Sequence, residues 1–324
     1  MQHEPPTDVA RPVAGVDVSK DQLDLFVDTV GRHLRVGNDD EGVARLVATL
    51  LEHGVRLVVV EATGRYHRRL AAALLQAGVD AAVVNPQQVR AFARAAGKLE
   101  KTDRIDAVVL ARFGRAMNPR ATVKTPENQT LLGDLVSRRR GLIQMRVAET
   151  NRAHEQLPKL AASQSRKLLR LIEQQVEDLD REIARLIEAD DDRNNAAKVI
   201  DSVPGIGPDT ANQLVVELPE LGELNRQQIA KLAGLAPLNC DSGRYRGQRK
   251  IRGGREEVRT CLYMAAFNAR RKCGRFKRYF DDLIARGKLY QVAMTACMRK
   301  LLVVLNQMVK NNTHWDHNLT GALA

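Results

Sequence analysis

The stretch Lys101-Thr102-Asp103-Arg104-Ile105-Asp106-Ala107 opens a predicted helix, because apolar residues recur at every fourth position from Ile105 onward. Asp103 and Asp106 are three residues apart, so both carboxylates leave the same face of that helix. Two carboxylates this close repel each other unless a cation or water lies between them. The alternative is structural, since acidic residues in a first helical turn also offset the helix macrodipole. The choice between a metal site and a structural role therefore depends on acidic residues elsewhere in the chain.

The composition is that of a globular protein with room for two domains. The chain has 324 residues, of which 44% are hydrophobic and 28% are charged. No apolar run approaches the ~18 residues of a membrane span. This pattern predicts a cytoplasmic protein that is neither secreted nor bound to a membrane. Its four cysteines are widely spaced without a Cys-x-x-Cys pair, which favours reduced thiols and no structural zinc.

Positive charge is concentrated in the last third of the chain. The formal net charge is +12. Between Cys240 and Lys310 the sequence has 18 Lys and Arg residues but 5 Asp and Glu residues, so the remainder is close to neutral. A basic segment attached to a near-neutral body indicates a polyanion as partner, most simply a nucleic acid.

Residues 1–125 are predicted to form an α/β domain. Helices are expected after the third, fourth and fifth of its short apolar strands, in the order β-β-β-α-β-α-β-α-α, which predicts a mixed sheet covered by helices. In a ribonuclease-H-like topology the first and fourth strands are neighbours at the centre of the sheet, and the last helix packs across their carboxyl ends. The expected strands lie at residues 13–18, 23–29, 33–36, 57–60 and 81–84.

Two further domains are predicted to be mainly helical. Residues 126–193 carry a narrow heptad seam over positions 169–186, which favours a coiled-coil helical hairpin over an ordinary amphipathic helix. Residues 194–324 contain Gly205 and Gly207 in a short turn that resembles a helix-hairpin-helix motif. The backbone N–H groups of such a turn can bind phosphate, but a plain tight turn between helices explains the same residues equally well.

Two acidic residues on the predicted strands supply partners for the two carboxylates of the helix. Asp17 lies within the first strand and Glu61 ends the fourth. Burying an unpaired carboxylate is costly, so Asp17 in an apolar strand favours a bound cation. Four carboxylates form an all-oxygen site that suits Mg²⁺ or Mn²⁺ and not zinc, and two such ions roughly 4 Å apart can assist phosphodiester cleavage. The other acidic residues of the second strand are expected on a solvated face: Asp21, Asp24 and Asp28.

Six short motifs, taken in order, span nearly the whole chain: Gly15-Val16-Asp17-Val18-Ser19-Lys20, Glu61-Ala62-Thr63-Gly64, Asn85-Pro86, the stretch 101–107, Val203-Pro204-Gly205-Ile206-Gly207 and Ser242-Gly243. In this order and spacing they resemble the DEDD transposases of insertion sequences, whose members include bridge-RNA-guided recombinases. The resemblance implies a RuvC-like N-terminal domain, a coiled-coil linker and a C-terminal transposase domain. It also implies that Asp17, Glu61, Asp103 and Asp106 bind Mg²⁺ and that Ser242 joins covalently to DNA.

The same resemblance implies the partners of the chain. Family members work as tetramers with a structured non-coding bridge RNA that pairs with donor and target DNA. A dimer or tetramer of this chain is therefore expected, with both DNAs and that RNA as partners. The resemblance also places the chain in a bacterium, associated with the nucleoid when it is bound to DNA.

Ser242 lies in a polar, glycine-rich stretch without a histidine nearby, so its hydroxyl must be activated from elsewhere, and the carboxylate-bound metal is the expected source. Without the resemblance, a loop serine in a solvated basic turn would be the simpler interpretation, and Tyr245 is a competing nucleophile. Basic residues that follow Ser242 are expected to hold the scissile phosphate and its neighbours: Arg244, Arg246, Arg249 and Lys250. Further contacts with nucleic acid are expected from Arg270, Arg271 and Lys272.

Three functions remain open at this point. The first is a recombinase that cleaves and exchanges DNA strands through a covalent phosphoserine. The second is a metal-dependent, structure-specific nuclease resembling a Holliday-junction resolvase, which releases free ends. The third is a nucleic-acid-binding protein whose carboxylates are vestigial. The intact set of four carboxylates argues against the third, and a basic domain larger than a nuclease needs argues against the second.

Overall fold

The computed structural model describes residues 12–62, 65–97, 103–122, 127–153, 158–238, 241–242, 245–246 and 249–316, with the backbone alone at 103–104, 127, 241–242 and 245–246. The chain divides into two compact units, residues 1–125 and 126–324, and each is described by itself. The finer division into three domains, with a boundary after residue 193, stays a prediction.

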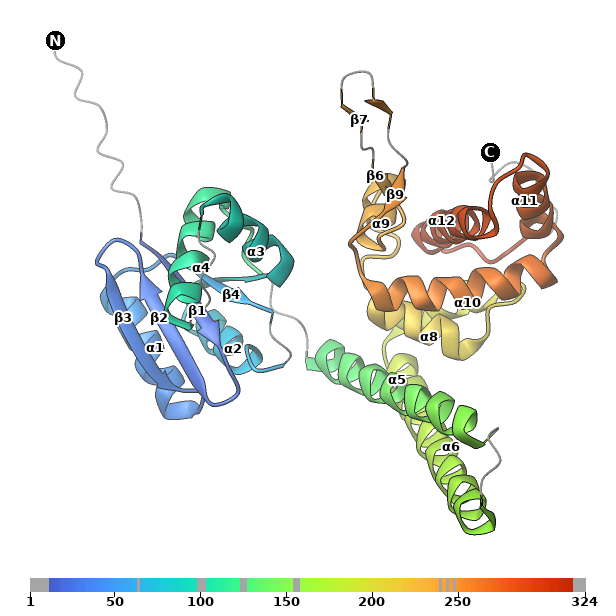
Figure 1. Cartoon of the computed structure of the whole chain (residues 1–324), viewed down its shortest axis with the longest axis horizontal. Helices are drawn as coiled ribbons and strands as arrows, with labels where there is room; N and C mark the ends of the chain where they lie inside the picture. The colour runs from blue at the N-terminus through green and yellow to red at the C-terminus, as the bar shows by residue number, and fades with distance from the viewer. Residues whose placement is uncertain are drawn as a thin grey trace. The chain divides into compact units, whose positions relative to one another are not determined.

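The first unit is built on a five-stranded mixed sheet with the order β3-β2-β1-β4-β5 (Figure 1). β1 pairs antiparallel with β2 and parallel with β4, and β4 pairs parallel with β5. The predicted placement of the first and fourth strands as neighbours is therefore confirmed. The strands are β1 (Val13–Val18), β2 (Gln22–Val27), β3 (Arg32–Gly37), β4 (Leu57–Glu61) and β5 (Asp80–Val84).

Helices cover both faces of this sheet. α1 (Asp40–Glu52) and α2 (Arg68–Gln76) pack on one face, and α3 (Pro86–Ala95) and α4 (Asp103–Met117) pack on the other. α1 begins where predicted, because the Asp39 side chain accepts a hydrogen bond from the backbone N–H of Gly42 at 2.8 Å. The result is a mixed α/β unit, an arrangement consistent with a ribonuclease-H-like transposase domain.

The second unit is mainly helical. Its core joins apolar side chains from all eight of the helices that the structure describes there. They are α5 (Glu127–Ala153), α6 (Lys159–Glu188), α7 (Asp191–Asp201), α8 (Pro208–Glu217), α9 (Arg226–Leu232), α10 (Glu256–Lys272), α11 (Gly274–Ala285) and α12 (Tyr290–Asn311). Two short ribbons stand between α9 and α10, where the sequence predicted a polar loop: β6 (Pro237–Leu238) with β9 (Lys250–Ile251), and β7 (Asp241–Ser242) with β8 (Tyr245–Arg246).

The predicted heptad seam packs α6 along α5 in a helical hairpin (Figure 1). Ile172 and Val176 on α6 form a small core with Leu142 on α5. Nearer the body of the unit, Ile183 on α6 and Leu132 on α5 join the main core. The seam of α6 is therefore filled within the chain.

α12 is long and apolar enough to cross a membrane by length and composition, which the sequence analysis did not anticipate. Half of its apolar window is buried inside the second unit, where Leu301, Leu302 and Leu305 are fully enclosed. Arg299 and Lys300 interrupt the apolar run, which explains why no continuous span was apparent in the sequence. α12 is the central core helix of this unit.

Candidate active site and nucleic-acid interface

Asp17 and Glu61 occupy equivalent positions on neighbouring strands. The parallel β1–β4 pairing aligns Val16 with Val60, and the two acidic residues come next in their strands. Val16 and Val60 pack against α1 and α2, so the residues that follow them face the opposite side, toward α3 and α4. Neighbouring strands are about 4.8 Å apart, so these carboxylates leave the sheet side by side. Such a pair needs a compensating charge or solvent.

α4 lies directly on the backbone of β1 because glycines remove the side chains between them. A Cβ on Gly15 would overlap the carbonyl oxygen of Ala107. Further along the helix, a Cβ on Gly114 would come within 2.6 Å of Val59 and 2.8 Å of Val13. The helix therefore runs antiparallel to β1, and its N-terminal turn lies at the strand end that carries Asp17.

The first turn of α4 supplies the other two predicted ligands. α4 begins at Asp103, and Asp106 in the same turn is half-buried. The strand register and the helix direction thus bring the backbone positions of all four acidic residues to one edge of the sheet. The side chain of Asp103 lies outside the described residues. Among the side chains that are described, no three His, Cys, Asp or Glu residues lie close enough together to hold a metal ion.

Two acidic residues of the second predicted strand, Asp24 opposite Asp17 and Asp28 at the other end of β1, have structural roles that the sequence analysis missed. Arg35 Nε donates a hydrogen bond to Asp24 at 2.7 Å, and the Asp24 side chain is 14% exposed. Asp28 accepts a hydrogen bond from the backbone N–H of Val13 at 2.9 Å and forms an ion pair with Arg115 on α4. The hydrogen bond to Asp28 raises the pKa of Arg115 above its ordinary value. The expected solvated face is therefore wrong for both aspartates, and Asp28 fastens α4 to the sheet.

Ser242 lies on the β7–β8 ribbon, where its backbone pairs with Tyr245, the competing nucleophile. This ribbon extends beyond the β6–β9 ribbon (Figure 1), in which Leu238 pairs with Lys250. Arg244 lies outside the described residues, as do the side chains of residues 242, 245 and 246. Ser242 and Tyr245 therefore lie opposite each other on the ribbon. Their positions do not show which of them is the nucleophile, so a chemical assay must decide.

The β6–β9 and β7–β8 ribbons together are called the Ser242 hairpin, and its base is where the chain enters and leaves the β6–β9 ribbon. Backbone packing and a paired arginine fix this base. Gly234 and Gly254 both have positive φ, +69° and +70°, and a Cβ on Gly254 would overlap the backbone nitrogen of Gly234. Arg255 donates to both carboxylate oxygens of Glu220, at 2.6 and 2.7 Å, and to the carbonyl oxygen of Glu217 at 3.0 Å. A bidentate arginine of this kind is geometrically specific, so the hairpin rises from a firmly held base.

The predicted basic contacts lie in different environments. Arg270 is half-buried, with its guanidinium carbon 4.4 Å from the ring centroid of Phe280 and within 6 Å of the rings of Phe267 and Tyr290. This cation–π packing joins α10 to α11 and α12. Contact with nucleic acid stays a prediction for the residues that are exposed: Arg249, Lys250, Arg271 and Lys272.

The turn with the two predicted phosphate-binding glycines packs against α10. Gly205 has a φ of +98°, and a Cβ there would come within 2.7 Å of the backbone of Asn268 and Ala269. This close approach accounts for Gly205 without a ligand. Gly207 caps the N-terminus of α8 and has open space around its Cβ position, so a phosphate contact at Gly207 stays a prediction.

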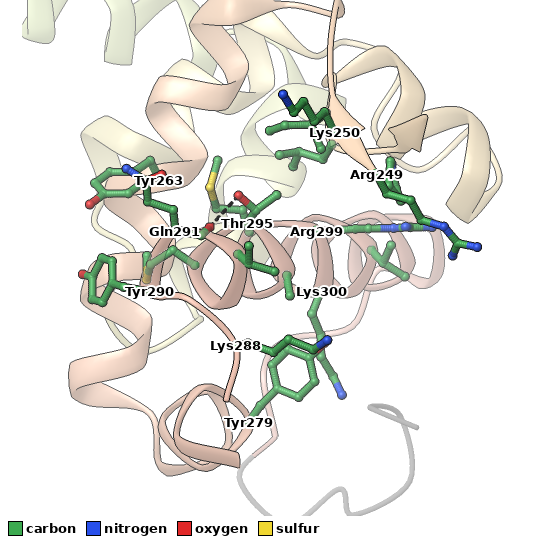
Figure 2. Close-up of a pocket in the computed structure, with 18 of the residues that line it drawn as sticks. Arg249, Lys250, Tyr263, Tyr279, Lys288, Tyr290, Gln291, Thr295, Arg299 and Lys300 are labelled. Atoms are coloured by element: carbon green, nitrogen blue, oxygen red, sulfur yellow. Dashed lines mark hydrogen bonds between the residues drawn. The ribbon is translucent and has the colours of Figure 1, made fainter. Parts of the chain in front are cut away.

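A groove of about 1300 Å³ opens beside the base of the Ser242 hairpin (Figure 2). Residues of α12 supply about half of its lining, and the rest comes from α9, α10, α11, both strands of the β6–β9 ribbon and the segments that connect these elements. Of its basic residues the sequence analysis named only two, because the others are scattered along the chain and meet only in the fold. Its basic and tyrosine side chains are Arg226, Arg249, Lys250, Lys288, Arg299, Lys300, Tyr263, Tyr279 and Tyr290.

Two family models match the chain, one in each half. A DEDD transposase model matches residues 14–162, and a model described as transposase IS116/IS110/IS902 family matches residues 197–281. With the carboxylate-bearing sheet edge, these matches define a DNA transposase, an enzyme that cleaves and rejoins DNA strands. The chain belongs to the IS116/IS110/IS902 family of insertion-sequence transposases.

Known relatives include proteins of two kinds. The chain is 26% identical over 317 residues to the pilin gene-inverting protein of Moraxella bovis, covering 94% of this chain and 98% of that protein. The pilin gene-inverting protein of Moraxella lacunata is similar to the same extent. An uncharacterized 43.6 kDa protein of insertion element IS110 from Streptomyces coelicolor is 28% identical over 169 residues, covering 52% of this chain and 40% of that protein.

Proposed function

We propose that this transposase exchanges DNA strands with two sets of residues: Asp17, Glu61, Asp103 and Asp106 hold Mg²⁺ or Mn²⁺, and Ser242 is the nucleophile. The observation that carries the metal assignment is the β1–β4 register, which pairs two carboxylates beneath the first turn of α4. The donor set consists of oxygen atoms alone, as these ions require. When bound, the ions supply charge stabilisation at the scissile phosphate.

Attack by Ser242 conserves the energy of the broken phosphodiester bond in a new ester bond to the protein. Its Oγ loses a proton and attacks phosphorus, a phosphorus–Oγ bond forms, and the bond from phosphorus to a deoxyribose oxygen breaks. That oxygen takes up a proton and leaves as a hydroxyl. The phosphate is then held as a phosphoserine ester, and the hydroxyl of a new strand reverses the step and restores Ser242. Strand exchange therefore needs no external energy source.

The names of two relatives favour strand exchange over simple hydrolysis as the reaction of this chain. Both are named for inverting a pilin gene, and inversion requires that each cleaved strand be rejoined to a new partner. A nuclease of the Holliday-junction-resolvase type would release free ends and leave nothing attached to the protein. We infer the same exchange chemistry for this chain, acting on DNA in the bacterial cytoplasm.

The resemblance to bridge-RNA-guided recombinases extends the proposal to partners. We infer that a dimer or tetramer binds donor and target DNA together with a structured non-coding RNA. RNA recovered with the purified protein should pair with both ends of the element and with its target. If strand exchange is undiminished after the RNA has been removed, the guide does not belong to the mechanism.

The nucleophile is tested by trapping cleavage on a nicked DNA substrate and looking for a protein–DNA adduct that survives denaturation. The adduct should form with the parent protein and with Tyr245→Phe, and it should vanish with Ser242→Ala. An adduct that persists in Ser242→Ala but is lost in Tyr245→Phe would overturn the serine assignment. Free ends that accumulate without any adduct would favour the nuclease.

A further inference from the structure

The groove beside the Ser242 hairpin is lined by several basic side chains. None of the described residues that line it is acidic. Some arginines elsewhere in the same unit are paired with carboxylates, as Arg140 is with Glu217 and Arg255 with Glu220. Fixed positive charge in a concave surface attracts a polyanion. Five of its cations form no ion pair with any carboxylate that the structure describes: Arg226, Arg249, Lys250, Lys288 and Arg299.

The same groove exposes aromatic rings. Tyr263 on α10 is 40% exposed and Tyr290 at the start of α12 is 44% exposed. Figure 2 shows these two tyrosines next to each other at one end of the groove. The ring of Tyr290 is held in place by an edge-on contact with Phe280, whose centroid is 5.5 Å away. Exposed, fixed aromatic rings beside unpaired cations are what proteins use to stack the bases of single strands.

The size and position of the groove suit a length of polymer. Its volume of about 1300 Å³ exceeds the roughly 300–1,000 Å³ of small-molecule sites. One side of it is the β6–β9 ribbon, with Pro237 from one strand and Lys250 from the other. These strands lead directly into the β7–β8 ribbon that carries Ser242. A strand lying in the groove therefore passes the base of the hairpin that bears the nucleophile.

We propose that this groove holds an unpaired segment of the DNA strand that Ser242 attacks. Bases stack on Tyr263 and Tyr290, and phosphates contact Lys288 and Arg299 on the other side of the groove. The segment is unpaired because the bases of a duplex are stacked on each other and cannot reach a tyrosine ring. That the bound strand is DNA rests on the proposed function, in which Ser242 attacks DNA. That the groove binds an unpaired strand does not depend on it.

The test measures binding in full-length Ser242→Ala protein, which lacks the proposed nucleophile. Fluorescent single-stranded DNA is titrated with the protein, and anisotropy gives the dissociation constant over a range of salt concentrations. Tyr263→Leu and Tyr290→Leu should each weaken binding by about 5- to 150-fold, the range expected for one lost base stack. Tyr290→Phe keeps the ring and should bind as the parent does.

Charge variants test the phosphate contacts. Lys288→Gln and Arg299→Gln should each reduce the slope of log affinity against log salt by about 0.7, the value for one contact with a single strand. Lys277→Gln is the matched control, because Lys277 is exposed on α11, pairs with Asp281 at 3.5 Å and lies outside the groove. It should leave the slope unchanged.

Several outcomes would overturn the proposal. One is unchanged single-strand binding in both leucine variants. Another is an equal loss of duplex binding, and a third is a loss confined to single-stranded RNA, which would assign the groove to RNA. Tyr290→Leu also removes packing on Phe280, so a thermal melt is run on each variant, and Tyr263→Leu reports stacking if Tyr290→Leu is unstable. The adduct assay is independent, since an adduct in Ser242→Ala would refute the nucleophile and leave the groove standing.

Discussion

The carboxylate edge of the first unit and the Ser242 hairpin of the second are held in opposite ways. At the carboxylate edge the backbone sets every position, through strand register and through α4 lying on Gly15. The Ser242 hairpin has only two-residue ribbons, and the groove beside it is lined by long basic side chains and by tyrosine rings. Metal ligands must be held to within a fraction of an ångström, whereas a polyanion can be bound by cations that adjust to it. The difference suggests that the first unit should tolerate no change of a ligand or of the backbone that positions it, whereas single substitutions in the second should weaken binding step by step.

The largest effect should come from removing a carboxylate. Asp17→Asn or Asp103→Asn should abolish strand cleavage in Mg²⁺, because each removes a charged oxygen ligand with almost no change in shape. Nucleic-acid binding should be largely intact, since the basic unit is untouched. Gel assays of cleavage and binding check both expectations. Full cleavage in either variant, or cleavage undiminished by EDTA, would remove these carboxylates from the mechanism.

The same variants can show whether one chain supplies a whole site. Asp103→Asn protein is mixed with Ser242→Ala protein, and recombination is assayed. If the halves come from different protomers, mixed oligomers contain some complete sites and activity should partly return. If assembly of the mixture is confirmed and activity stays absent, each site is built within one chain.

The next effect should be on stability, at the glycine beneath α4. Gly15→Ala places a methyl group against helix backbone, which cannot move aside without displacing α4, and overpacking of this kind costs about 1–3 kcal/mol. Gly114→Ala meets only side-chain atoms and should cost less. Gly133→Ala, on α5 with open space around its Cβ position, is the control and should stabilise by roughly 0.5–1 kcal/mol. Thermal unfolding of the three proteins gives the order, and equal melting temperatures for the first two would show that α4 is not held this way.

The smallest effects should separate basic residues that pack from those that bind. Lys272→Gln should leave the melting temperature unchanged, Arg271→Gln should lower it slightly because its guanidinium carbon is 5.7 Å from the Phe267 ring centroid, and each should reduce the salt slope of duplex binding by about 0.9. Arg270→Gln should do the reverse, with a loss of roughly 0.5–2 kcal/mol of stability, because its guanidinium packs on aromatic rings. A salt slope that falls with Arg270→Gln at unchanged stability would assign Arg270 to the nucleic acid instead.

Local patterns were enough to predict much of the first unit from sequence. Continuous apolar runs marked β4 and β5, and the Asp39 cap and Pro86 marked helix starts. The expected ribonuclease-H-like topology made the first and fourth strands neighbours, and the structure confirms that pairing and places the backbones of Asp17 and Glu61 side by side. The seam of α6 was also predicted, because a heptad repeat is visible within one continuous stretch of sequence.

What the sequence could not predict depends on contacts between distant residues. The ion pair of Asp28 with Arg115 spans 87 positions, so nothing near Asp28 in the sequence distinguished it from a solvated aspartate. The ribbons at 237–251 are too short and polar to show alternation. The groove gathers residues from α9 to α12, and the burial of Arg270 follows from rings on three helices. In each case the fold brings together residues that have no shared local pattern.

The two glycines at the base of the Ser242 hairpin make the segment between them suitable for exchange between related proteins. Because Gly234 and Gly254 touch through their backbones, residues 235–253 begin and end at a single point, and Leu235 is the one described side chain of this segment that belongs to the main core. A chimera that exchanges this segment between related chains would inherit Ser242, Arg249 and Lys250 as one block. The residues on α10 and α12 would stay with the recipient. Libraries of such chimeras would show whether reactivity and strand preference are inherited separately.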